Sequence, residues 1–150
     1  MLNQDYKEML QLLLEHKAKF LVIGAYAMGV HGYPRATADI DIWVEASVEN
    51  SKRVYMAIKD FGAPLYDIDE MTFSKKDAIF QIGIAPRRID ILSEIEGIEF
   101  GEAYDKRIEV ELEDLTIPFI SREFLIKSKS ATGRDRDRID VENLLRDKTK

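Results

Sequence analysis

FLVIGAYAMGVHGYPRATADIDIWVE, residues 20–45, contains an apolar run, a glycine, a short helical segment and a second apolar run that opens with two aspartates. Residues two apart in a β-strand point to the same face of the sheet. Asp39 and Asp41 are therefore predicted to lie side by side, with Ile40 and Ile42 on the opposite face. Two adjacent carboxylates repel each other unless a cation lies between them. Because hard divalent cations such as Mg²⁺ bind one or two carboxylates together with substrate phosphates, this stretch predicts a metal–phosphate site.

The spacing within this stretch resembles the motif of the nucleotidyltransferase superfamily. That motif is a glycine and a small residue, then about a dozen residues, then two aspartates alternating with apolar residues; here 13 residues separate Gly24-Ala25 from the first aspartate. The full segment, residues 24–42, is most similar to the minimal nucleotidyltransferases related to the AbiEii abortive-infection toxins. The family usually has Ser or Gly after the first glycine. Ala25 has no hydroxyl group, so a phosphate contact there must come from backbone N–H groups.

The resemblance implies an α/β (α+β) fold of the nucleotidyltransferase (polymerase β-like) type, a mixed β-sheet with helices packed on it. It also implies in-line attack on the α-phosphate of a nucleoside triphosphate (NTP) at a two-metal Mg²⁺ site. In such a site one metal activates the attacking oxygen, and both neutralise charge on the phosphate and the pyrophosphate leaving group.

A third carboxylate is expected from Asp90, which lies in an alternating β-like run over residues 88–92. An aspartate between isoleucines is costly to bury without a partner, and the resembling family has its third aspartate on a neighbouring strand at about this remove. The alternative is a strand-edge ion pair between Asp90 and one of three arginines, Arg87, Arg88 or Arg107. The sequence leaves both interpretations open.

The C-terminal part, residues 125–140, also resembles the toxin-like members, which carry a Leu-x-x-x-Lys element followed by an Arg…Asp-x-x-Asp element. Lys129 fits the lysine position and is expected to hold triphosphate oxygens as a point charge. Arg134 could bind phosphate through its planar guanidinium group. Asp137 and Asp140 share a helix face and could orient either cation. The alternative is a salt-bridged surface helix, because mixed charges at this density are often a solvated face.

Two further polar residues precede the aspartates, and both are candidates for contact with a phosphate or the acceptor. Arg35 and Thr37 lie just before the predicted metal strand; the alternative for Arg35 is an ion pair with an acid in a loop. Trp43 shares the face of the aspartates and is predicted to be a core aromatic. The two histidines, His16 and His31, have no partner at ligand spacing and are assigned to packing or to the surface.

The motif Asp67-Ile68-Asp69 repeats the same three letters after a Gly-Ala-Pro turn, with no apolar strand behind it. We interpret it as a solvated loop.

The rest of the chain alternates helical and β-like segments, which indicates layers around one sheet. Helices are predicted over residues 3–17, 25–31, 47–61, 99–104, 121–131 and 135–146. Strands are predicted over residues 20–23, 39–45, 78–85, 88–92, 107–112 and 116–120. With no repeat, low-complexity tract or long linker, residues 1–150 are expected to form a single nucleotidyltransferase domain.

Composition narrows the classes of function. The sequence has no cysteine, so disulfides, thiolate zinc sites and cysteine nucleophiles are excluded. No apolar run is long enough to span a bilayer and no signal-peptide pattern is present, so we expect no membrane partner and a cytoplasmic location. The net charge of −6 argues against broad nonspecific nucleic-acid binding.

These features predict a Mg²⁺-dependent transferase that moves a nucleoside monophosphate from an NTP to a hydroxyl group of an RNA (tRNA) or protein acceptor. The resemblance allows a role in a toxin–antitoxin pair, and the short chain suggests a partner protein or a homo-oligomer. The first alternative is a noncatalytic nucleotide-binding or partner-binding, antitoxin-like member, which Ala25 favours. The second is a Mg²⁺-dependent phosphohydrolase, which the lack of a candidate base near the acids disfavours.

Overall fold

The computed structural model describes residues 2–146 and contains a six-stranded mixed sheet in the order β3-β4-β2-β1-β6-β5. The strands are β1 (Phe20–Ile23), β2 (Asp39–Val44), β3 (Ile79–Ile82), β4 (Arg88–Leu92), β5 (Ile108–Leu112) and β6 (Leu115–Phe119). The helices are α1 (Gln4–Glu15), α2 (Gly24–Val30), α3 (Val48–Phe61), α4 (Phe100–Asp105), α5 (Arg122–Thr132) and α6 (Asp135–Arg146), with a 3₁₀ turn, η1 (Thr72–Ser74). The predicted mixed sheet with packed helices is confirmed.

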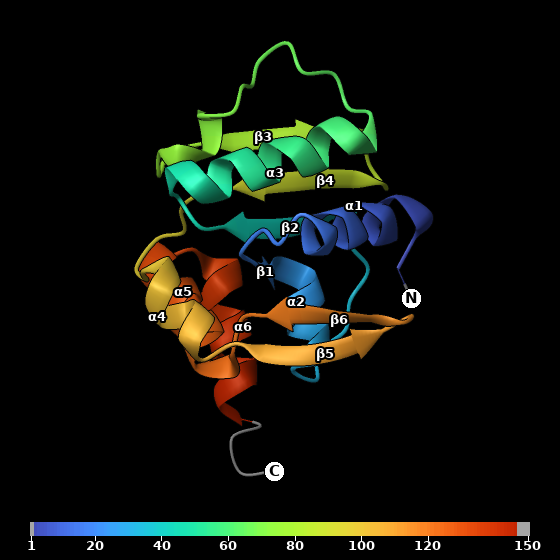
Figure 1. The fold of residues 1–150 in the computed structure, drawn as a ribbon. Coiled ribbons are helices and arrows are strands. Elements are labelled where there is room, and N and C mark those ends of the chain that lie inside the picture. Colours follow the sequence, from blue (N-terminus) through green and yellow to red (C-terminus); the bar gives the residue numbers. More distant parts are fainter. Residues whose placement is uncertain (1, 147–150) are drawn as a thin grey trace.

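Helices lie around the sheet in two groups (Figure 1). Helices α1 and α3 contact each other over the part of the sheet formed by β2, β3 and β4, whereas α5 and α6 pair near β1 and β6. Met1 and residues 147–150, the ends of the predicted single domain, lie outside the described residues. That residues 1–150 form one domain stays a prediction.

Polar side chains fix where three of the helices begin. Asn3, Ser47 and Ser121 each precede a helix and accept a hydrogen bond from the backbone N–H three residues later. Such caps satisfy an amide that has no partner inside the helix and stabilise its first turn. The sequence therefore sets the starts of α1, α3 and α5 locally.

The register of β2 with its neighbours places the predicted metal ligands. Strand β2 is parallel to β4, and Asp41 is opposite Asp90 while Asp39 is opposite Arg88. It is antiparallel to β1, whose last residue, Ile23, is opposite Asp41. Because the alternate side chains Ile40 and Ile42 are buried, a one-residue slip would bury the aspartates instead, and the core fixes the register.

Most predicted boundaries agree with the structure to within about two residues, and β3 is the main exception. Residues 78–85 were expected to form one strand, but β3 is only Ile79–Ile82. Gly83 has a φ of +76°, and the Arg87 N–H donates to the Ile84 carbonyl at 2.9 Å in the turn that leads into β4. The second half of the predicted strand is therefore part of this turn.

The loop that follows β4 packs tightly against α5. A Cβ atom added to Gly97 would lie 2.5 Å from the Cβ of Ala131, closer than two carbon atoms can approach. This contact between two small residues joins the end of the β4 strand to the helix that carries Lys129. Among the helices of residues 2–146, none is long and apolar enough to cross a membrane.

Candidate functional site: an acidic and a basic wall around one cleft

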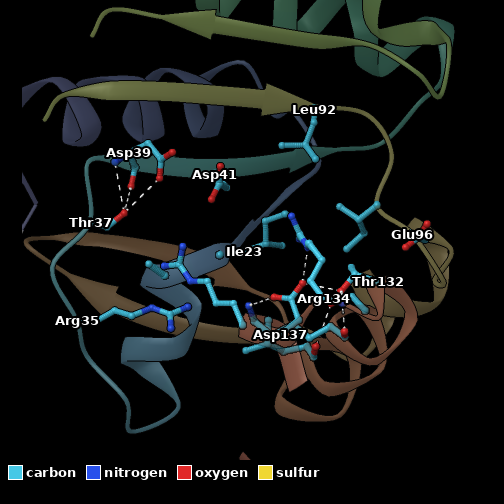
Figure 2. Close-up of a pocket in the computed structure, with 17 residues that line it drawn as sticks. Ile23, Arg35, Thr37, Asp39, Asp41, Leu92, Glu96, Thr132, Arg134 and Asp137 are labelled. Atoms are coloured by element: carbon cyan, nitrogen blue, oxygen red, sulfur yellow. Dashed lines mark hydrogen bonds and ion pairs between the residues drawn. The ribbon is translucent and has the colours of Figure 1, made fainter. Parts of the chain in front are cut away.

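The residues predicted from sequence converge on one cleft with a volume of about 720 Å³ (Figure 2). The predicted residues that line it are Gly24, Ala25, Arg35, Thr37, Asp39, Asp41, Lys129 and Arg134. Asp90 is buried beside the cleft, next to Asp41. Small-molecule sites typically occupy about 300–1,000 Å³, so the cleft has the size of a nucleotide or substrate site.

One side of the cleft, which we call the acidic wall, consists of Asp39, Asp41 and Asp90. Each contributes a carboxylate oxygen, and these oxygens all lie within 4.8 Å of one another. The parallel pairing of β2 with β4 causes this convergence, because residues opposite each other on neighbouring strands point to the same face. The predicted third carboxylate is thus brought to the first two.

Gly24 supplies the space that Asp41 needs. Its φ of +71° lies in the left-handed region, and a Cβ atom on it would lie 2.2 Å from Asp41 Oδ2. Any other residue at this position would be strained and would push the Asp41 carboxylate out of place. The glycine of the motif is therefore a packing requirement of the acidic wall as well as a turn.

The acidic wall carries unbalanced negative charge at Asp41. Burial, and then the charges of Asp39 and Asp90, raise the pKa of Asp41 from 3.8 to about 7, against a smaller lowering effect of Arg88. Without another cation, a large fraction of Asp41 is thus protonated near neutral pH. A group with this pKa favours the binding of a positive charge beside it.

Arg88 provides the positive charge that the acidic wall has. Its Nε donates to Asp90 Oδ1 at 3.0 Å, and its Nη2 donates to Asp39 Oδ2 at 2.5 Å and to Asp90 Oδ2 at 3.2 Å. The ion pair that the sequence left open as an alternative for Asp90 is therefore formed, and it coexists with the carboxylate cluster. These two acids raise the pKa of Arg88 above its ordinary value.

Thr37 acts on the acidic wall at Asp39. Its hydroxyl lies 3.2 Å from Asp39 Oδ1 and 3.1 Å from the Asp39 carbonyl oxygen, and the Asp39 N–H lies 3.4 Å from the same hydroxyl. Figure 2 shows Thr37 at the start of β2, next to the carboxylate. The side chain thus orients a predicted metal ligand, whereas sequence reasoning assigned it to a phosphate or the acceptor.

The opposite side of the cleft, which we call the basic wall, consists of Arg35, Lys129 and Arg134 with the two acids that hold them, Asp137 and Asp140. Lys129 Nζ lies 2.9 Å from Asp140 Oδ2 and 3.3 Å from Asp137 Oδ1. The Lys129 side chain is only 13% exposed and is salt-bridged within the helix pair, so it is not a solvated surface lysine, and its role toward a phosphate stays a prediction.

The two arginines of the basic wall differ in their freedom. Arg35 forms two parallel hydrogen bonds with Asp140, at 2.9 and 3.0 Å, so its partner is an acid of α6 instead of the loop acid that was the alternative. Arg134 Nε donates to Asp137 Oδ2 at 2.8 Å, but its side chain is 74% exposed. Arg35 is therefore held in place, whereas Arg134 can reorient toward a ligand.

Asp137 and Asp140 are buried acids that stay ionised. Burial alone would raise the pKa of each, but hydrogen bonds and charges outweigh it and lower the pKa. For Asp137 these come from Thr132, Lys129 and Arg134, and for Asp140 from Arg35 and Lys129. The sequence-based suggestion that these acids orient Lys129 or Arg134 agrees with this geometry.

The residues that were not assigned to the site from the sequence lie outside the cleft. His16 Nε2 is 2.7 Å from Asp60 Oδ2, and His31 Nε2 is 2.9 Å from the Ile120 carbonyl oxygen. Trp43 is buried with its ring edge-to-face against Phe100. The Asp67–Asp69 segment lies in an exposed loop with only its isoleucine buried. None of these residues lines the cleft formed by the described part of the chain.

Sequence reasoning missed Thr132 and named Arg88 only as one of three possible ion-pair partners of Asp90. Arg88 lies two residues before Asp90 and so shares its face, a signal that alternation offers once β4 is recognised. Thr132 donates to Asp137 Oδ2 at 2.6 Å, and only the packing of α5 on α6 reveals this contact.

The chemistry of the donor set fits Mg²⁺. The candidate ligands within residues 2–146 are three carboxylates, and Mg²⁺ prefers oxygen ligands and binds one or two carboxylates with phosphates. The space that Gly24 leaves for Asp41 keeps one of these carboxylates at the cleft. Asp39, Asp41 and Asp90 are thus the residues that would hold the ion.

Solved structures show the same fold at low sequence identity. A Thermotoga maritima protein described as a candidate nucleotidyltransferase matches with a TM-score of 0.61 and 16% identity, over 99% of this chain and 97% of that one. The lincosamide antibiotic adenylyltransferase LnuA, bound to lincomycin, matches with a TM-score of 0.60 and 19% identity, over 97% of both chains. No curated protein matches the sequence.

A third structure, ANT(2″)-Ia in complex with adenylyl-2″-tobramycin, has a TM-score of 0.57 and 14% identity, over 93% of this chain and 84% of that one. At these identities the likeness shows the fold alone. A family model, in contrast, matches residues 2–148 of the sequence. The chain therefore belongs to the nucleotidyltransferase superfamily, within the family described as "Nucleotidyltransferase of unknown function (DUF6036)".

Proposed function

We propose that the chain catalyses Mg²⁺-dependent transfer of a nucleoside monophosphate from an NTP to a hydroxyl group. In this reaction the acceptor oxygen bonds to the α-phosphorus, the bond from that phosphorus to the pyrophosphate oxygen breaks, and the hydroxyl loses its proton to solvent. When bound, Mg²⁺ supplies positive charge to the phosphates and promotes loss of the hydroxyl proton.

The observation that carries the proposal is the convergence of Asp39, Asp41 and Asp90 on one side of a cleft whose other side presents Lys129 and Arg134. A purely structural site would balance the charge of all three acids with nearby cations. Here Arg88 balances only part of that charge, and the cations of the basic wall are held by their own acids, Asp137 and Asp140, so the acidic wall keeps negative charge for another cation.

Each residue has a role that its surroundings support. Asp39, Asp41 and Asp90 hold the metal, and Thr37 orients the first of them. Lys129 attracts phosphate oxygens as a fixed point charge, since two buried acids hold its ammonium group.

The remaining cleft residues bind the nucleotide. Arg134, which is exposed, can form a bidentate contact with a phosphate. Arg35 is fixed by Asp140, and its side chain is 30% exposed where it lines the cleft, so its positive charge can attract a phosphate. Gly24 and Ala25 offer only backbone groups to the cleft.

The acceptor we propose is a hydroxyl group of an RNA, such as tRNA, or of a protein. A partner protein or a second copy of the chain would help to bind it, and the pair would act as part of a toxin–antitoxin system. The chain's similarity to the minimal toxin-like nucleotidyltransferases supports this choice.

A second candidate acceptor is the hydroxyl group of a small molecule. Two proteins of the same fold, LnuA and ANT(2″)-Ia, are respectively a lincosamide adenylyltransferase and a protein solved with adenylyl-tobramycin. Both are covered by this chain over most of their length. A domain of this size can therefore be built around a small acceptor.

The test is label transfer from each of the four α-³²P-labelled NTPs with Mg²⁺, offered in parallel to bulk tRNA, lysate proteins, lincomycin and tobramycin. The control is the double variant Asp39→Asn with Asp41→Asn. A labelled product that the double variant does not form supports the proposal and identifies both the base and the acceptor. Release of orthophosphate instead of pyrophosphate would favour a phosphohydrolase.

The noncatalytic alternative gives a different result. Mg²⁺-dependent NTP binding without labelling of any acceptor, by a protein that also releases no pyrophosphate, would overturn the transferase proposal. It would favour the nucleotide-binding or partner-binding role instead.

A further inference from the structure

We propose that the side chain of Arg88 competes with the metal ion for the carboxylates of the acidic wall. Its guanidinium group holds the carboxylates of Asp39 and Asp90 while the site has no divalent cation, and it leaves them when the ion binds. This inference rests on the proposed metal site and assigns a positioning role to a residue outside the aspartate motif.

The contacts of Arg88 are those of a bound cation. Three hydrogen bonds of 2.5 to 3.2 Å join its Nε and Nη2 to Asp39 and to both oxygens of Asp90. Such bidentate, charge-assisted contacts are the strongest that a guanidinium group forms. Arg88 thus bridges two strands, because Asp39 is its register partner on β2 and Asp90 is on its own strand, β4.

The same oxygens cannot serve both cations fully. A Mg²⁺ ion held by Asp90 needs a lone pair of one of its two carboxylate oxygens, and both of these oxygens now accept from Arg88. A Mg²⁺ ion and a guanidinium group beside the same carboxylates also repel each other. Binding of the ion must therefore displace the guanidinium or be weakened by it.

The Arg88 side chain is free to move away. It is 35% exposed, so it can rotate toward solvent without opening the core. Its neighbour Arg87 is an internal control, since it has the same charge one residue away but points elsewhere and lies 3.8 Å from Asp5. Substitution of Arg87 removes a nearby positive charge without touching the acidic wall.

The test compares the affinity of Mn²⁺ alone, counted as free ion by electron paramagnetic resonance, in wild type, Arg88→Met and Arg87→Met. Removing the competing charge from the acidic wall should tighten Mn²⁺ binding by about tenfold or more in Arg88→Met. Arg87→Met should change it by less than about twofold, because a solvated charge is screened. In the absence of metal, Arg88→Met should unfold at a lower temperature than Arg87→Met.

Unchanged or weaker Mn²⁺ binding in Arg88→Met would overturn the inference, because a merely structural arginine would support the site. If wild type transfers nucleotides and binds Mn²⁺ but Arg88→Met shows no tightening, only this inference fails. If neither protein binds Mn²⁺, the metal part of the proposed function fails with it. Binding by Arg88→Met but not by wild type would be the strongest support.

A measurement on the wild-type protein covers the case in which Arg88→Met does not fold. The Arg88 Nε–H donates to Asp90, so its NMR signal, assigned by its loss in Arg88→Lys, should exchange slowly with water. Saturating Mg²⁺ should shift this signal and speed its exchange. A signal that Mg²⁺ leaves unchanged would contradict displacement.

Discussion

On the acidic wall three carboxylates share one arginine, whereas on the basic wall three cations share two buried carboxylates. The difference appears in the pKa values: that of Asp41 is raised to about 7, and those of Asp137 and Asp140 are lowered. The carboxylates of the basic wall thus have their counter-charges, whereas the carboxylates of the acidic wall do not. The comparison suggests that the basic wall is preformed and that the acidic wall is completed by its ligand.

The largest effect is expected on nucleotidyl transfer when the acidic wall is disrupted. Replacing Asp39 and Asp41 together by Asn should lower nucleotidyl transfer by at least about a thousandfold, since the charge that binds the metal is lost. The same change should alter the stability of the metal-free protein little, because the repulsion that it removes offsets the ion pair between Asp39 and Arg88 that it also removes. Steady-state kinetics and thermal unfolding in EDTA check the two effects. Unchanged turnover would refute the assignment of the metal site.

The second largest effect is expected on the stability of the protein when the basic wall is disrupted. Asp140 is 3% exposed and accepts from both Arg35 and Lys129. Asp140→Asn removes the counter-charge of Arg35 and one of the two counter-charges of Lys129, and it should reduce the free energy of unfolding by about 3 kcal/mol, measured by urea denaturation.

The matched control on the same helix is Asp135→Asn, because Asp135 is exposed and pairs only with Arg138 among the described contacts. It should cost less than about 0.5 kcal/mol. An equal loss in both variants would show that the basic wall is not the stable half of the cleft.

A smaller effect is expected at Gly24, whose backbone conformation makes room for Asp41 of the acidic wall. Gly24→Ala should cost about 1–2 kcal/mol for a left-handed alanine and should also weaken metal binding, because the new Cβ displaces Asp41. Gly62→Ala is the control: its φ is +94°, and a Cβ there meets nothing within 4 Å. Loss of stability with intact Mn²⁺ affinity in both variants would show that Gly24 serves the turn alone.

The pH dependence separates the walls without any large change in structure. Because the folded-state pKa of Asp41 is about 7 and its ordinary value is 3.8, its contribution to metal-free stability is complete below about pH 4. That contribution is lost as pH rises through about 7, whereas a metal, which needs the ionised form, binds more tightly over the same range.

Unfolding of the metal-free protein from about pH 4 to about pH 8, compared with Asp41→Asn, measures this contribution. The slope should be shallower in the variant. Asp137 and Asp140 work in the opposite sense: since their pKa values are lowered, the stability they give is lost as the solution is acidified below their ordinary range. Identical slopes in wild type and Asp41→Asn would contradict the raised pKa.

The smallest effect is expected where the sequence repeats the motif without the structure. Asp67→Asn, in the exposed Asp67-Ile68-Asp69 loop, should change stability by less than about 0.5 kcal/mol and transfer not at all. Thermal unfolding and label transfer check it. A loss of transfer in this variant would mean that the loop takes part in the reaction.

Local patterns were enough to predict the β1-α2-β2 segment and the side-by-side placement of Asp39 and Asp41, because strand alternation is a property of consecutive residues. Superfamily membership and the mixed sheet were also predicted and are confirmed. The roles of the individual site residues stay predictions.

What the sequence could not supply came from contacts between distant elements. The position of Arg88 between Asp39 and Asp90 depends on the parallel register of β2 with β4, which the sequence does not reveal across a separation of 49 residues. Likewise, Arg35 meets Asp140 across 105 residues. These two ion pairs depend on how distant elements are arranged in the fold, so local patterns in the sequence do not predict them.

The contact between Gly97 and Ala131 limits how far the loop after β4 stands from α5, and at a φ of +87° any side chain at position 97 also strains the backbone. A larger side chain at position 97 would act as a wedge between the loop after β4 and α5, and it would move Lys129 away from the aspartates without altering any charge. A series of increasing side-chain size at this position, with Gly97→Ala as the reference for backbone strain, would therefore measure how nucleotide transfer depends on the distance between Lys129 and the aspartates.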